Sequence, residues 1–182
     1  KSGKSQVTFK ILRQCIGRDT KVYAFVSTLH KDPLWKKMVE WMDKKNIQFE
    51  GHTSLNEDGV NVLAELIQEL EIEGEDEEEE PLPKPRKLIR CNEDDDECDK
   101  KKRKEKLLAP EVLIIFDDLS RELKSPVLVS LLKKNRHFKS KIIVSSQYCH
   151  DLDPQSLQQM HYFLLFKGHP ERKMEKLWTD AD

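Results

Sequence analysis

Two short segments far apart in the chain do most to limit the folds open to it. Residues 1–5 read Lys-Ser-Gly-Lys-Ser, and the last three match the end of the phosphate-binding loop pattern G-x-x-x-x-G-K-[ST]. Residues 112–118 read Val-Leu-Ile-Ile-Phe-Asp-Asp, an apolar run typical of a buried parallel strand with two carboxylates at its end. Together these segments predict a P-loop α/β domain with a nucleoside triphosphate site.

The loop and the start of the helix after it are expected to bind the nucleotide, through Ser2, Gly3, Lys4, Ser5 and Gln6. Gly3 has no Cβ, so its backbone can approach phosphate, and Lys4 can reach the β- and γ-phosphates. The Ser5 hydroxyl and the Asp117 carboxylate would hold Mg²⁺, so the predicted cofactors are ATP and Mg²⁺. The helix directs the positive end of its dipole at the same phosphates. The alternative is an ordinary loop and a solvated strand end.

Helices and strands are predicted to alternate along the chain. Apolar periodicity predicts helices over residues 5–16, 32–45, 56–72, 125–134, 154–160 and 170–178, with the Asn-Glu-Asp-Gly of 56–59 as a cap. Apolar runs predict strands over residues 21–27, 47–49, 112–116, 141–146 and 162–166. The alternation predicts a mainly parallel sheet sandwiched by helices. The strand that feeds the loop, and the first glycine of the pattern, would lie upstream of Lys1.

Charge is concentrated in one internal segment. Residues 73–107 contain 14 of the 34 acidic and 10 of the 32 basic residues, which leaves 20 acidic and 22 basic residues elsewhere. The segment has too little apolar surface to offset the entropy of ordering it. We therefore predict one P-loop ATPase domain over residues 1–182, interrupted by a disordered insert at about 73–107. The basic stretch 100–106 could have a function, as a contact with DNA or as a localisation signal. The alternative is that the acidic and basic blocks simply solvate each other.

The sequence also argues against several kinds of protein. No apolar run approaches the roughly 20 residues that span a bilayer, and the chain shows no signal peptide. The spacing of its four cysteines fits no disulfide framework, so a reducing compartment is expected. Cys91 and Cys98 have the wrong spacing for a zinc knuckle.

Three further residues are candidates for catalysis. Asp118 follows the predicted Mg²⁺ ligand, where it would orient the attacking water, with an N-capping role as the alternative. Gln147 follows the strand 141–146 and would contact the γ-phosphate or the water, unless it is an ordinary surface amide. Arg136 would act as an arginine finger on an adjacent subunit, or else as a cation at a helix C-terminus. Arg172 is the rival finger.

Several of these segments resemble one protein family. Residues 132–147, which run from Leu132 through Arg136-His137 to Gln147, resemble a signature of poxvirus-type viral genome-packaging ATPases of the FtsK–HerA superfamily. Residues 112–118, 3–5 and 25–35 are similar to that family's Walker B motif, Walker A motif and the segment after its second strand. The aspartate at 118 and the long charged insert depart from the family pattern.

The resemblance carries several implications for function. It implies a motor that couples ATP hydrolysis to moving double-stranded DNA into a preformed capsid. It also implies a homo-oligomeric ring with ATP at the subunit interfaces, a capsid or portal protein as partner, and an intracellular site of viral assembly. The residues themselves leave two other classes of protein open. One is another P-loop ATPase, such as a helicase, and the other is a catalytically inert scaffold with this fold.

Overall fold

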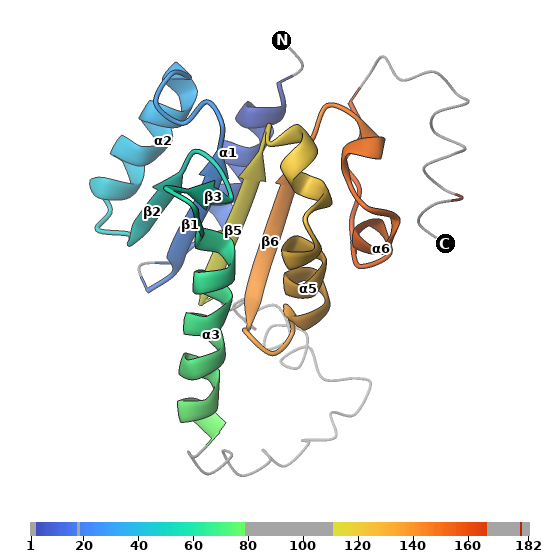
Figure 1. Ribbon diagram of the computed structural model, residues 1–182. Coiled ribbons are helices and arrows are strands. Elements are labelled where there is room, and N and C mark those ends of the chain that lie inside the picture. The colour runs from blue at the N-terminus through green and yellow to red at the C-terminus, as the bar shows by residue number, and fades with distance from the viewer. Residues whose placement is uncertain (1–2, 18, 79–110, 167–178, 180–182) are drawn as a thin grey trace, which may run out of the picture.

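The computed structural model describes residues 3–17, 19–78, 111–166 and 179. Within them a central sheet lies between helices on its two faces (Figure 1). The predicted α/β class, with a mainly parallel sheet sandwiched by helices, is therefore confirmed. In the part of the chain described, no helix has the length and apolar character needed to cross a membrane.

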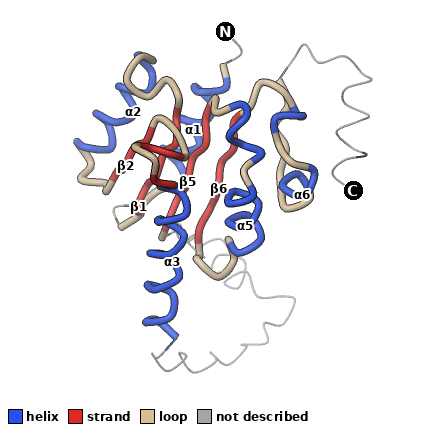
Figure 2. The backbone as a smooth tube through the Cα atoms, in the orientation of Figure 1, coloured by secondary structure: helices blue, strands red, loops and turns tan. Residues whose placement is uncertain are grey.

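The central sheet has four parallel strands, in the order β2-β1-β5-β6. Their bounds are Lys21–Val26 for β1, Phe49–His52 for β2, Val112–Asp117 for β5 and Ser140–Ser145 for β6. All six residues of β5 are buried, as a central parallel strand requires. Val26, Asp117 and Ser145 are register partners, so β1, β5 and β6 end at the same edge (Figure 2). In open parallel sheets this edge forms the ligand crevice.

The helices cover both faces of the sheet with separate hydrophobic clusters. α1 (Lys4–Cys15) and α2 (Pro33–Asp43) pack on one face, where Leu12 and Met38 are buried with residues of β1 and β5. α3 (Val62–Glu78) and α5 (Pro126–Lys134) pack on the other, where Leu63 and Leu128 are buried. Short helical segments η1 (Ser120–Lys124), η2 (Cys149–Asp151) and α6 (Pro154–Leu157) complete the described part. Most predicted elements therefore form within a few residues of their expected bounds.

The expected helix cap at residues 56–59 is wrong. Asn56 and Glu57 form strand β3 of a small hairpin, and Asp58 and Gly59 form its turn to β4 (Val60–Asn61). Asp58 and Gly59 both have positive φ, at 51° and 83°, the conformation that an Asp-Gly hairpin turn favours. The cap is five residues later, where the Asn61 side chain accepts a hydrogen bond from the Ala64 N–H at 2.8 Å.

Helix α3 extends into the range expected for the insert. Its last residue is Glu78, so the range expected to begin at about residue 73 overlaps the end of this helix. The rest of the insert, with its basic stretch 100–106, lies outside the described residues.

The strand expected over residues 162–166 does not form. These residues have no ladder partner, because β6 pairs only with β5 among the described strands. Their apolar side chains stay accessible, with Tyr162 90% exposed and Leu164 65% exposed. An apolar run makes a strand only where a neighbouring backbone offers hydrogen bonds. The helix expected over 170–178 lies outside the described residues.

Candidate nucleotide site

Gly3 forms the turn at the start of α1. Its φ of 78° lies in the left-handed region, and its carbonyl oxygen accepts the Val7 N–H at 3.1 Å. No described atom lies within 4 Å of a Cβ built at Gly3, so the backbone conformation, not crowding by the protein, favours glycine here. The first N–H groups of a helix lack partners inside it, and the first turn of α1 contains no acidic residue.

This helix start has the properties of an anion site. Free N–H groups and the positive end of the dipole favour phosphate there. Lys4, Ser5 and Gln6 begin α1, at the edge where β5 and β6 end (Figure 1). Lys4 and Ser5 are half-buried there, and Gln6 is exposed. Ser2 lies outside the described residues.

Asp117 is the most enclosed acidic group of the site. It ends β5 and is only 4% exposed. The Ser5 hydroxyl donates to its Oδ2 at 3.5 Å, so the loop and the strand meet as the sequence predicted. The same Oδ2 accepts a shorter hydrogen bond, 2.9 Å, from the indole N–H of Trp35. No motif in the sequence marks Trp35 as part of the site; the available signal is that a buried indole N–H needs an acceptor.

The donors fit Mg²⁺ in their chemistry. A serine hydroxyl and a carboxylate are hard oxygen ligands, and they lie side by side between α1 and β5. The described residues contain no cluster of three or more histidine, cysteine or acidic side chains able to hold a metal. Mg²⁺ needs none, because it commonly binds one or two carboxylates together with substrate phosphates and water.

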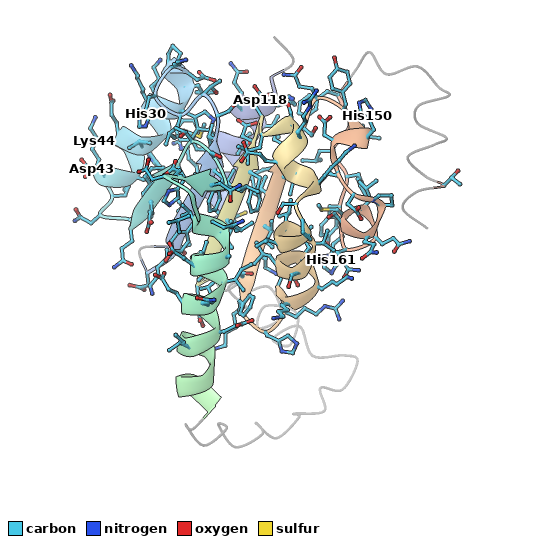
Figure 3. All side chains as sticks on the ribbon, viewed as in Figure 1. His30, Asp43, Lys44, Asp118, His150 and His161 are labelled. Atoms are coloured by element: carbon cyan, nitrogen blue, oxygen red, sulfur yellow. The ribbon has the colours of Figure 1, made fainter. Side chains whose placement is uncertain are left out.

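Asp118 is held in an unusual backbone conformation at the same edge (Figure 3). Its φ is 58°, in the left-handed region. Its N–H donates to the Ser145 carbonyl at 3.2 Å, and its carbonyl accepts the Ser27 hydroxyl at 2.8 Å. Its Oδ1 accepts the Gln147 side-chain amide at 2.9 Å. Strain of this kind persists where the surroundings over-determine it, and such residues cluster at functional sites.

Asp118 and Gln147 contact each other, and neighbouring residues serve as the helix caps nearby. Leu119 precedes η1 and makes no side-chain cap, and Ser125 caps α5, so Asp118 is not an N-cap. Gln147 is exposed, and its side-chain amide donates a hydrogen bond to Asp118. The fold therefore brings both residues together at the carboxyl ends of β5 and β6.

Arg136 is far from this edge within its own subunit. It follows the end of α5 and precedes β6, so it lies at the amino end of that six-residue strand. At about 3.3 Å per residue, β6 separates Arg136 from the Asp117 edge by roughly 20 Å. The fold does not bring Arg136 to the nucleotide site of its own chain, and Arg172 lies outside the described residues.

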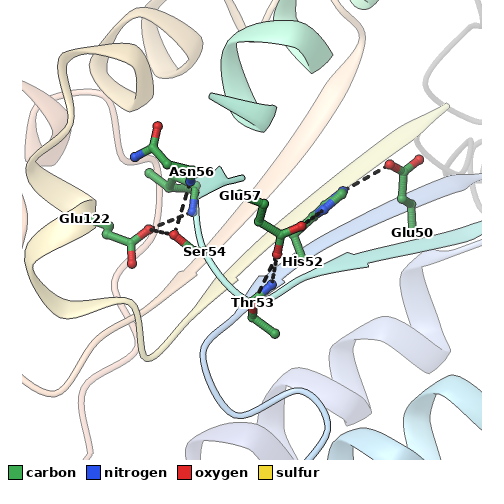
Figure 4. A network of polar contacts seen from close by, with 8 residues as sticks. Glu50, His52, Thr53, Ser54, Asn56, Glu57 and Glu122 are labelled. Atoms are coloured by element: carbon green, nitrogen blue, oxygen red, sulfur yellow. Dashed lines mark hydrogen bonds and ion pairs between the residues drawn. The ribbon is translucent and has the colours of Figure 1, made fainter. Parts of the chain in front are cut away.

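The segment after Asp118 is tied to the loop that leads into the β3–β4 hairpin, a link the sequence did not reveal (Figure 4). Glu122 in η1 accepts hydrogen bonds from the Ser54 hydroxyl at 2.9 Å and from the Leu55 N–H at 2.6 Å. Both donors lie 67 or 68 residues away in the sequence. A long-range side-chain contact of this kind leaves no local pattern in the sequence.

A second group of contacts orders the same hairpin. Glu57 accepts the Thr53 N–H at 2.8 Å and the Thr53 hydroxyl at 3.0 Å, and lies 3.2 Å from His52 Nδ1. The backbone hydrogen bond from Thr53, and then that from His52, lower the pKa of Glu57 below its ordinary value of 4.5. Nε2 of the same imidazole lies 3.0 Å from Glu50.

With this geometry established, comparison with known proteins gives one match. A family model described as Poxvirus A32 protein matches residues 79–179, more than half of the chain. The matched range contains Asp117, Asp118, Arg136 and Gln147, but not the loop at Gly3. No curated protein and no solved structure matches.

Proposed function

The chain belongs to the Poxvirus A32 protein family, a family of viral genome-packaging ATPases, and we propose that it hydrolyses ATP to move double-stranded DNA into a preformed capsid. The single observation that carries the proposal is the convergence of two contacts at one edge of the sheet: Ser5 with Asp117, 112 positions apart, and Asp118 with Gln147. These contacts would form the two parts of a hydrolytic site.

The first part would bind the triphosphate. Lys4 and the first N–H groups of α1 offer positive charge to the β- and γ-phosphates. Ser5 and Asp117 would hold Mg²⁺, which neutralises charge on the phosphates when bound. Because Asp117 is buried, its attraction for a cation is weakly screened by solvent.

The second part would activate water. Gln147 holds one oxygen of the Asp118 carboxylate, which leaves the other oxygen to accept a hydrogen bond from the attacking water. The contacts of the Asp118 backbone with Ser27 and Ser145 fix where that carboxylate stands. Positioning of the water relative to the γ-phosphate is the main contribution such a residue makes.

The direct test of hydrolysis is a pair of lysine variants in the full-length protein. Lys4→Ala should abolish Mg²⁺-dependent phosphate release, because it removes the charge aimed at the phosphates. Lys10→Ala, an exposed lysine on the same helix, is the matched control and should keep wild-type turnover. Unchanged turnover in Lys4→Ala would refute the site.

The motor proposal adds DNA and a ring of subunits. A motor that grips the phosphate backbone should bind duplex DNA of any sequence, with affinity that falls steeply as salt rises. In the ring, Arg136 would complete the site of the adjacent subunit. Since Arg136 lies at the amino end of β6, this requires that end of one sheet to face the carboxyl-end edge of the next.

Subunit mixing tests the role of Arg136. Lys4→Ala and Arg136→Ala subunits, each inactive alone, should recover partial ATPase activity when mixed. Recovery is expected because some interfaces then combine an intact Lys4 with an intact Arg136. If activity does not recover in mixtures shown to co-assemble, Arg172 becomes the proposed arginine finger.

A capsid or portal protein is the proposed partner of the ring.

A further inference from the structure

Trp35 makes an unusual contact for a core residue. Its side chain is 0% exposed, and its indole N–H donates to Oδ2 of Asp117 at 2.9 Å. Asp117 is the only ionisable side chain that is buried among the described residues, and no ion pair joins it to a described cation. A buried carboxylate is costly unless it is hydrogen-bonded or paired with a cation.

The local structure fixes where the indole stands. Asp32 caps α2 by accepting the Leu34 N–H at 2.8 Å, and Pro33 occupies the first position of the helix. Trp35 is therefore in the first turn, next to the carboxyl end of β1. Met38 and Met42 lie three and seven positions later and are also fully buried, so one stripe of α2 is anchored on the sheet.

The chemistry of the indole suits a residue that orients a metal ligand. Indole N–H is a donor only, so it fixes one carboxylate oxygen in place. The indole is neutral, so it leaves the negative charge of Asp117 available to a cation, whereas lysine or arginine would neutralise it. The Ser5 hydroxyl reaches the same oxygen at a longer distance, 3.5 Å. The second oxygen, Oδ1, is then turned in a defined direction.

We propose that Trp35 is a positioning residue, which holds the Asp117 carboxylate in the orientation needed to bind Mg²⁺ with the nucleotide. The inference rests on the proposed function, because it assigns to Trp35 a role in that same site. It goes beyond packing: removal of the N–H alone, with the ring retained, should weaken metal binding.

The first experiment compares two tryptophan variants of the full-length protein. Trp35→Phe keeps an aromatic ring but removes the N–H; Trp41→Phe, on the same helix and in edge contact with Phe9, is the control. The readout is the Mg²⁺ concentration that half-saturates binding of a non-hydrolysable ATP analogue. A lost hydrogen bond to a charged group predicts a rise of about 10- to 100-fold in Trp35→Phe. Trp41→Phe should match wild type.

A split between metal dependence and maximal rate separates positioning from loss of structure. Excess Mg²⁺ should restore most of the turnover of Trp35→Phe, and its affinity for the nucleotide without Mg²⁺ should equal that of wild type. An unchanged Mg²⁺ midpoint in a folded Trp35→Phe protein would overturn the inference. Absence of Mg²⁺-dependent nucleotide binding in the wild type would instead overturn the proposed function itself.

A second measurement does not depend on the folding of Trp35→Phe. In the wild-type protein, the indole N–H resonance of Trp35 should shift when Mg²⁺ is added to the nucleotide-saturated state, and that of Trp41 should not. In the metal-free state, Asp117→Asn should also shift the Trp35 resonance. If the Trp35 resonance moves in neither case, the hydrogen bond does not report on the metal ligand and the inference fails.

Discussion

Replacement of Glu122 by alanine should destabilise the protein through the hairpin that Glu122 holds. The carboxylate accepts from Ser54 at 2.9 Å and from the Leu55 N–H at 2.6 Å, and both contacts are partly buried. A hydrogen bond to a charged group contributes about 1.5–3 kcal/mol, and partial exposure reduces this. We therefore expect Glu122→Ala to lower the free energy of unfolding by about 2–4 kcal/mol, or about 4–16 °C in melting temperature for a chain of this size.

Chemical and thermal unfolding of five proteins, the wild type and four variants, would measure this contribution. Ser54→Ala and the double variant complete a cycle with Glu122→Ala, and the coupling energy between the two sites should be about 1 kcal/mol. Arg121→Ala, an exposed neighbour in η1, is the control and should change stability by less than about 0.5 kcal/mol. Amide exchange at Leu55 should also become faster in Glu122→Ala. Additive effects of Glu122 and Ser54, or a loss no larger than that of the control, would refute the reasoning.

Two further predictions concern Asp118 and Glu57. Asp118→Gly and Asp118→Ala should both lose hydrolysis. In unfolding experiments the glycine variant should be more stable than the alanine variant by about 0.5–1 kcal/mol, since alanine is strained at φ 58°. Equal stability of the two variants would argue against strain at this position. Because folding lowers the pKa of Glu57, its contribution to stability is present above the ordinary value of 4.5 and is lost as pH falls through the lowered value. Glu57→Gln should therefore lower the melting temperature at pH 7 and flatten its decline below about pH 4.5; parallel curves would contradict this.

The parts of the site that the sequence predicted follow from topology. A run of buried apolar residues ending in Asp117 and Asp118 marks the carboxyl end of a parallel strand, and Gln147 follows the next strand along the chain. Parallel strands end at one edge, so the sequence could place these side chains at the same edge. The start of α1 follows from Gly3, since a glycine at this position permits the observed left-handed turn.

The parts that were missed depend on long-range partners. Within the helix predicted over residues 32–45, Trp35 has the pattern of an ordinary apolar residue, because nothing local to it shows that its indole N–H meets Asp117, 82 positions away. Residues 162–166 have the composition of a strand, but strand formation also requires a neighbouring backbone, which composition does not reveal. The hairpin at Asp58-Gly59 is different, because Asp-Gly is a known turn signal and favoured a hairpin over a helix cap from the start.

The most direct test of the central claim is ATP-dependent displacement of a third strand from triplex DNA, measured beside ATPase activity with and without duplex DNA. For a double-strand motor, duplex DNA should stimulate hydrolysis, the wild-type protein should displace the third strand, and a forked duplex should stay paired. Lys4→Ala should show neither DNA-stimulated hydrolysis nor displacement. Displacement that requires separation of the fork would indicate a helicase. Hydrolysis that duplex DNA does not stimulate, with no displacement of the third strand, would contradict the proposed motor.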